Sequence, residues 1–196
     1  GSVMGADGKS KAHDFRPLEG REFDDDWQRN EKERTALVGI RNDQARPTVH
    51  ARNLWHQSAL SYDAWAAWAT PSSIAPQPWL LGNTVGDFAC NWDSLVQVEN
   101  NPERKAARER SISYGSYRLM LHRFENAPRR DRIMTHLHSQ MEQLGFDTAF
   151  HSTEYTTGNL EHDAGALGNY LAEQYISFGL QDGAFEEIDY QNTYYN

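Results

Sequence analysis

Hydrophobic residues recur at steps of three and four along most of this chain, which is the spacing expected of amphipathic α-helices. The first predicted helix covers residues 47–69 and begins at Pro47, which is tolerated in an opening turn because its missing N–H would have no helical partner there. Its predicted face carries Ala51, Leu54, Ser58, Tyr62, Trp65 and Trp68. We expect Trp55, Trp65 and Trp68 to lie in the core, because an amphipathic helix must bury its apolar side.

A second helix is predicted over residues 101–124. Asn101 is its expected N-cap, Pro102 suits the first turn, and Glu103 lies favourably beside the positive end of the helix dipole. The flank that we expect to be buried carries Tyr114, Tyr117, Leu121 and Phe124. Gly115 interrupts this flank, and a residue without a Cβ lets another element approach the helix closely.

Two more helices are predicted towards the C-terminus. The helix over residues 127–145 has its apolar stripe at Ile133, Leu137, Met141 and Leu144, and it is expected to end at Gly145 in a left-handed cap. The helix over residues 162–183 has its apolar positions at Leu167, Tyr170, Leu171, Gln174, Tyr175 and Phe178, and Gly183 is expected to end it.

The remaining segments lack a sustained period. Residues 1–34 are rich in glycine and charge and are predicted to form an irregular N-terminal arm. Residues 70–101 hold three of the seven prolines, which predicts a long irregular connection with one short helix around Asp87–Val98. No strand pattern of comparable length is present, so the expected fold is all-α: a single helical domain over residues 35–196, itself part of a larger bundle.

Composition and charge exclude several classes of protein. The formal net charge of −9 disfavours a nucleic-acid partner, because binding to the phosphate backbone needs a clustered basic face. No stretch approaches the roughly 18 apolar residues of a membrane-spanning helix. Cys90 is the single cysteine, so an internal disulfide is excluded.

Three stretches carry a family resemblance: "ARNLWHQSALSYDAWAAW" at 51–68, "ARERSISYGSYRLMLHRF" at 107–124, and "LGNYLAEQYISFGLQDGAFEEIDYQNTYYN" at 167–196. Residues 45–196 resemble the N-terminal helical half of bacterial proteins related to vanadium-dependent haloperoxidases, within the type-2 phosphatidic acid phosphatase superfamily. The resemblance implies a helical bundle and, because members are typically exported, a periplasmic or extracellular location. It also implies chemistry on an oxyanion, either vanadate or phosphate.

The oxyanion-binding motifs of that superfamily are incomplete in this chain. They comprise a Lys and an Arg, a Ser-Gly-His stretch, and an Arg with a His, usually in the C-terminal half. There is no Ser-Gly-His here. Arg130 and His136 have the spacing of the third motif, but Arg129 replaces the expected Ser and Gln140 the expected Asp. We therefore favour a solvated helix face over an oxyanion-binding role for Arg130 and His136.

The sequence therefore predicts a helical scaffold that lacks a complete catalytic set. Its expected partner is a missing C-terminal half or another protein chain, an oligomer is left open, and vanadate is expected as a cofactor only where the catalytic half is present. The alternative is a non-catalytic binding or assembly subunit that uses its aromatic segments at 79–98 and 185–196 as an interface.

Two groups of polar residues complete the candidate sites. Arg52, His56 and Asp63 fall near one face of the first helix, where they either fix partner helices through buried hydrogen bonds, which we favour, or line a pocket. The best metal candidates by composition flank an acidic loop and are His151, Glu154, His162 and Asp163, although such loops are usually only solvated.

Overall fold

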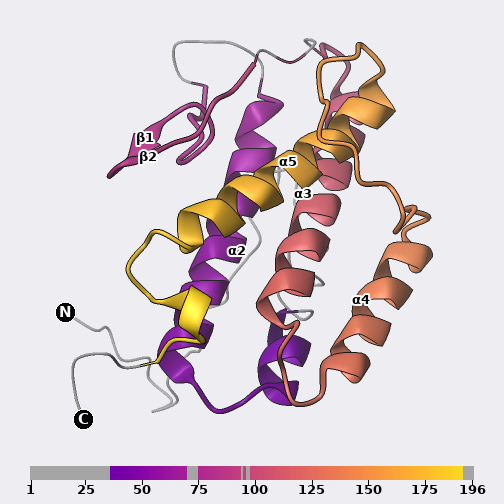
Figure 1. Ribbon diagram of the computed structural model, residues 1–196. Helices are drawn as coiled ribbons and strands as arrows, with labels where there is room; N and C mark the ends of the chain where they lie inside the picture. Colours follow the sequence, from indigo (N-terminus) through magenta and orange to yellow (C-terminus); the bar gives the residue numbers. More distant parts are fainter. Residues whose placement is uncertain (1–35, 70–74, 94, 96–97, 192–196) are drawn as a thin grey trace, which may run out of the picture.

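The computed structural model describes residues 36–69, 75–93, 95 and 98–191, and within these ranges the chain is mainly helical (Figure 1). The elements are α2 (Pro47–Ala67), the strands β1 (Thr84–Val85) and β2 (Phe88–Ala89), α3 (Asn101–Arg123), α4 (Arg130–Gln143), α5 (Leu160–Gly179) and the 3₁₀ turn η1 (Glu186–Ile188). Residues 36–42 are also helical. The all-α prediction is confirmed. The predicted arm at residues 1–34 lies outside the described residues.

Helix α3 is the centre of the bundle, and α2, α4 and α5 all pack against it. Its closest neighbour is α5, at a crossing made possible by two glycines. A Cβ on Gly168 would lie 2.4 Å from the carbonyl oxygen of Ser111, and a Cβ on Gly115 would lie 3.1 Å from that of Gly168. The close approach predicted for Gly115 is therefore confirmed, and Gly168 is its partner across the interface.

The buried face of α2 differs from the predicted one. Ala51, Ser58 and Tyr62 are exposed, Leu54 and Trp65 are half-buried, and only Trp68 of the predicted face is buried. Trp55, expected in the core, is 46% exposed. The side chains that α2 buries in their place include Asn53, His56, Gln57, Leu60 and Asp63. An apolar pattern could not identify this face, because three of its polar residues, His56, Gln57 and Asp63, are buried with hydrogen-bond partners on other elements.

The helix ends follow the sequence unevenly. Gly145 ends α4 with φ +72°, and the Phe146 and Gly145 amides bond the carbonyls of Met141 and Glu142, which is a Schellman motif. The N-cap of α3 is Asn100 rather than Asn101, whose side chain instead accepts from Arg104. Helix α5 starts at Leu160 and stops at Gly179, four residues before Gly183, and the carbonyl of Gly179 accepts a hydrogen bond from Arg52 of α2.

The connection between α2 and α3 contains a small hairpin in place of the predicted helix. Residues 87–93, 95 and 98 are not helical, and β1 and β2 pair antiparallel with Val85 opposite Phe88. The two-residue loop is Gly86-Asp87, and Gly86 has φ +59°. Glycine at the first central position with a positive φ is typical of a type II′ hairpin turn, which reverses the chain too sharply for a helix. None of the helices within the described ranges combines the length and apolarity needed to span a membrane.

Candidate functional site

A cluster of titratable side chains, most of them charged, lies where α2, α3 and the segment after α5 meet. We call it the ion-pair cluster; its members are Arg52, His56, His122, Arg123, Asp182 and Glu186. Figure 1 shows η1, in yellow, lying beside the start of α2. Four of its members come from two helices of the central bundle, and the two carboxylates come from the segment that follows α5.

Glu186 is bonded to three basic side chains of the cluster. Its Oε2 accepts from Arg52 at 2.9 Å and pairs with Nη1 of Arg123, while its Oε1 lies 3.1 Å from Nε2 of His122. Burial alone would raise the pKa of this carboxyl, but the hydrogen bond from His122 and the charge of Arg123 outweigh burial and lower the pKa to about 2. Glu186 is thus held firmly in its ionised form.

Arg52 joins α2 to the end of α5. Its Nε donates to Asp182 at 2.6 Å, and its Nη2 donates to the Gly179 carbonyl at 2.8 Å as well as to Glu186. Burial lowers the pKa of this guanidinium, but hydrogen bonds to the two carboxylates more than compensate, so the pKa is raised. Gly179 leaves room for both guanidiniums, because a Cβ there would lie 2.5 Å from Nη2 of Arg123 and 2.7 Å from Nη2 of Arg52 and would push them aside.

His56 is buried at the centre of the cluster in its neutral form. Its Nδ1 lies 2.9 Å from Nη2 of Arg123. Because arginine can only donate, Nδ1 must be the acceptor, which leaves the proton on Nε2, 3.4 Å from Oδ2 of Asp182. Burial, and then the positive charges of Arg123 and Arg52, lower the pKa of His56 to about 3. His56 therefore bridges an arginine and an aspartate without carrying charge.

Asp63 lies apart from the ion-pair cluster, eleven residues or about 16 Å along α2 from Arg52. Its fully buried carboxylate accepts from the amides of Trp79, Leu80 and Leu81 at 2.5, 2.9 and 3.0 Å. It also accepts from the Tyr175 hydroxyl at 3.0 Å. Four donors occupy this carboxylate, which pins the connection after α2 onto the bundle. The structural role favoured for Asp63 agrees with this geometry.

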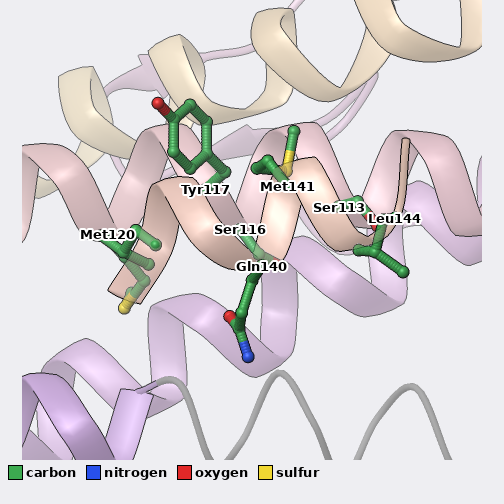
Figure 2. A pocket seen from close by; sticks show the side chains of 8 residues that line it. Ser113, Ser116, Tyr117, Met120, Gln140, Met141 and Leu144 are labelled. Atoms are coloured by element: carbon green, nitrogen blue, oxygen red, sulfur yellow. The ribbon is translucent and has the colours of Figure 1, made fainter. Parts of the chain in front are cut away.

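A small groove between α3 and α4 is the hollow that Figure 2 shows. Its volume is about 30 Å³, room for one or two water molecules rather than a substrate. The side chains that line it are Ser113, Ser116, Tyr117, Met120, Leu137, Gln140, Met141 and Leu144. None of the predicted site residues lies in it. Its lining is mostly apolar, so the groove lacks the charged groups that catalysis on an oxyanion requires.

The other predicted site residues do not assemble into a centre. Arg130 is exposed and pairs with its neighbour Asp131, and no contact joins it to His136 on the same helix. Asp163 accepts from the amides of Thr157 and Gly158 at 3.1 and 2.9 Å, so it orders the loop before α5. Burial by itself would raise the pKa of Asp163, but the hydrogen bond from the Thr157 hydroxyl at 2.6 Å, together with these two amides, lowers it.

The metal candidates likewise stay apart. His162 lies 3.3 Å from Asp163, whereas His151 and Glu154 are exposed side chains of the preceding loop. In the part of the chain that the structure describes, no group of three or more His, Cys, Asp or Glu side chains could hold a metal ion. This loop has a structural role, because it ends at Asn159, whose side chain caps α5 by accepting from the amide of His162.

Sequence reasoning missed four members of the ion-pair cluster: His122, Arg123, Asp182 and Glu186. The signal was present but ambiguous, since "LHRF" places two basic residues where α3 should be buried, and "LQDGAFEE" places acidic residues just beyond a helix end. Only the turn after Gly179 brings the two stretches together. Searches of protein-family models, of curated proteins and of solved structures found no match to this chain.

Proposed function

We propose that this chain is the helical scaffold portion of a vanadium-haloperoxidase-like or phosphatase-like protein. In this proposal the oxyanion-binding residues come from a C-terminal half or from another chain, and the assembled protein is exported. The scaffold supplies the bundle on which that half is built. Any vanadate or phosphate chemistry belongs to the assembly and not to these residues alone.

The observation that carries the proposal is the meeting of the three resembling stretches in one cluster. Arg52 and His56 belong to the stretch 51–68, Arg123 to 107–124, and Asp182 and Glu186 to 167–196. These stretches are far apart in the sequence, yet their charged residues bond one another directly. A shared internal cluster is the kind of feature that related scaffolds would have in common.

Charge pairing favours a scaffold over a self-contained enzyme. An oxyanion site needs positive groups aimed at a cavity and not yet neutralised. Arg52 and Arg123 are instead bonded to the carboxylates of Asp182 and Glu186, and the neutral His56 lies between them. The cluster is therefore balanced, with two guanidinium charges against two carboxylates, and it joins elements together.

The test is the intact mass of the protein from its natural source, with peptide mapping of its C-terminus and vanadium NMR titration with orthovanadate. We expect a mass above the 22.4 kDa of this chain, sequence beyond Asn196 that contains Ser-Gly-His, and vanadate binding by the longer form only. Arg130→Ala in this chain should leave its vanadium NMR titration with orthovanadate unchanged. Stoichiometric vanadate binding by this chain alone, abolished by Arg130→Ala, would overturn the scaffold proposal.

A second candidate function is a binding or assembly subunit, favoured by exposed aromatic and aliphatic side chains. Trp92 is 36% exposed and Ile188 38%, within the two segments predicted as an interface. Trp55 is 46% exposed and packs edge-on against Trp79 at 4.7 Å between ring centroids. Light scattering at several protein concentrations tests self-association. A dimer that Trp92→Ser dissociates into monomers would favour this function. A monomer with no co-purifying chain would contradict it.

A further inference from the structure

Three basic side chains, Arg52, His122 and Arg123, surround the carboxylate of Glu186, and we call the binding position that they form the seat. Arg52 and Arg123 share one of its oxygens, and His122 bonds the other. Bonding both oxygens of one carboxylate in this way is how proteins bind carboxylate ligands. Here the ligand is part of the chain itself.

The seat is oriented by groups other than Glu186. Arg123 has a fully buried side chain, and its Nη2 lies 2.9 Å from His56 Nδ1 and 3.3 Å from the carbonyl oxygen of Tyr175. Arg52 is held by the Gly179 carbonyl and by Asp182. Both guanidiniums would keep these contacts if residues 185–190 lifted, although Arg52 would lose the Tyr190 hydroxyl, 3.3 Å from its Nη1, as well as Glu186. The remaining contacts make the seat preorganised. In addition, Nε of Arg123 is buried and has no hydrogen-bond partner.

The segment that carries Glu186 is held mainly by polar contacts. No residue of the 3₁₀ turn η1 is buried as a whole, although the side chain of Glu186 is only 9% exposed, and Ile188 is 38% exposed. Phe185, Asp189 and Tyr190 have φ values of 58°, 53° and 59°, in the left-handed region that non-glycine residues seldom adopt. Such strain persists only while surrounding contacts enforce it, so lifting residues 185–190 would release it.

We propose that Arg52, Arg123 and His122 form a carboxylate-binding site, which Glu186 fills in this structure and which an external carboxylate enters when residues 185–190 lift away. Charge selects the ligand. When Glu186 has left, Asp182 is still bonded to Arg52, so the two guanidinium charges are opposed by the one carboxylate of Asp182. The net charge of +1 matches a monocarboxylate better than a phosphate dianion. The site does not depend on the proposed family membership.

Chemical rescue tests the site, with acetate as the probe. Glu186→Ala should be destabilised and should regain stability in sodium acetate relative to sodium chloride at equal ionic strength. At acetate concentrations about ten times its Kd, the folding equilibrium constant should rise about tenfold. Asp189→Ala is the matched control, because it removes a 62% exposed carboxylate from the same segment that pairs with Arg46 outside the seat. It should show no preference for acetate.

Hydrogen exchange on the unmodified chain gives an independent measurement that needs no variant to fold. Amides of residues 185–190 should exchange several-fold faster in acetate than in chloride, while those of α3 remain protected. Equal exchange in the two salts, together with a folded Glu186→Ala that acetate does not stabilise, would overturn the proposal. Rescue by phosphate in preference to acetate would overturn the assignment to carboxylates.

Discussion

Replacing Asp63 by asparagine should be among the most destabilising near-isosteric changes in this chain. The carboxylate is fully buried and accepts four hydrogen bonds: three from the consecutive amides of residues 79–81 and one from Tyr175. Asparagine has one acceptor oxygen and an NH₂ group, which must face a donor. At least one backbone N–H would therefore lose its partner away from water.

The magnitude follows from the bonds that are lost. A hydrogen bond to a charged group contributes about 1.5–3 kcal/mol, and an unsatisfied buried donor costs about 1–3 kcal/mol. We expect Asp63→Asn to lower the free energy of unfolding by about 3–5 kcal/mol, a large part of the stability of a typical domain. Tyr175→Phe removes only the fourth bond, leaves no backbone N–H without its partner and should cost about 1.5 kcal/mol, the low end of the same range, which makes it the matched control.

Urea denaturation followed by circular dichroism at the helical minimum measures both variants. The double variant should cost less than the sum of the single ones, because the Tyr175 bond is already weakened when the charge of Asp63 is lost. If Asp63→Asn stays within about 1 kcal/mol of the parent chain, the four short contacts contribute little and Asp63 does not hold the connection after α2 in place.

Three further predictions concern the helix crossing and the ion-pair cluster. Gly168→Ala should lower the free energy of unfolding by about 2 kcal/mol or more in urea denaturation, although alanine favours helices, because the added Cβ meets the Ser111 carbonyl. Arg123→Met should cost about 3–5 kcal/mol by the same assay, because it leaves Glu186 buried beside fewer positive charges. Thermal melts should show stability falling by about 2 kcal/mol from pH 7 to pH 5, because the unfolded chain protonates His56 near its ordinary pKa of 6.5 and the folded one only near 3.

The same contacts provide the control for Gly168→Ala and the direction of the pH dependence of stability. Glu173→Ala on the exposed side of α5 should stay within about 0.5 kcal/mol, and Gly168→Ala at that level would refute the crossing argument. For His56 the lowered folded pKa means that stability is lost as pH falls from 6.5 towards 3, and His56→Gln should flatten this range. Glu186, whose pKa is lowered to about 2, adds a second loss between pH 4.5 and 2.

Local features of the helices were predictable because they depend on nearby residues. The steps of three and four identified the buried residues Ile133, Leu137 and Met141 of α4 and Leu167, Leu171 and Tyr175 of α5. The rest of the two predicted stripes is less buried: Leu144 is 38% exposed, and Tyr170, Gln174 and Phe178 are half-buried. Gly145 ended α4 as its type suggested. The hairpin was missed because a two-residue loop with Gly86 is a weak signal inside a proline-rich stretch. The buried face of α2 was missed because hydrophobicity cannot show that a polar side chain has a distant partner.

The sequence by itself determined the helical class, the starts of α2 and α3 and the glycine that permits a close helix crossing, since these follow from propensity, periodicity and the absence of a Cβ. Only the tertiary structure decided the fate of the polar residues. Arg52 and His56 became parts of one ion-pair cluster and Asp63 a clamp on another segment, although all three share a helix. A charge can be buried only where a partner is folded against it, and for Arg52 that partner lies 130 residues away along the chain.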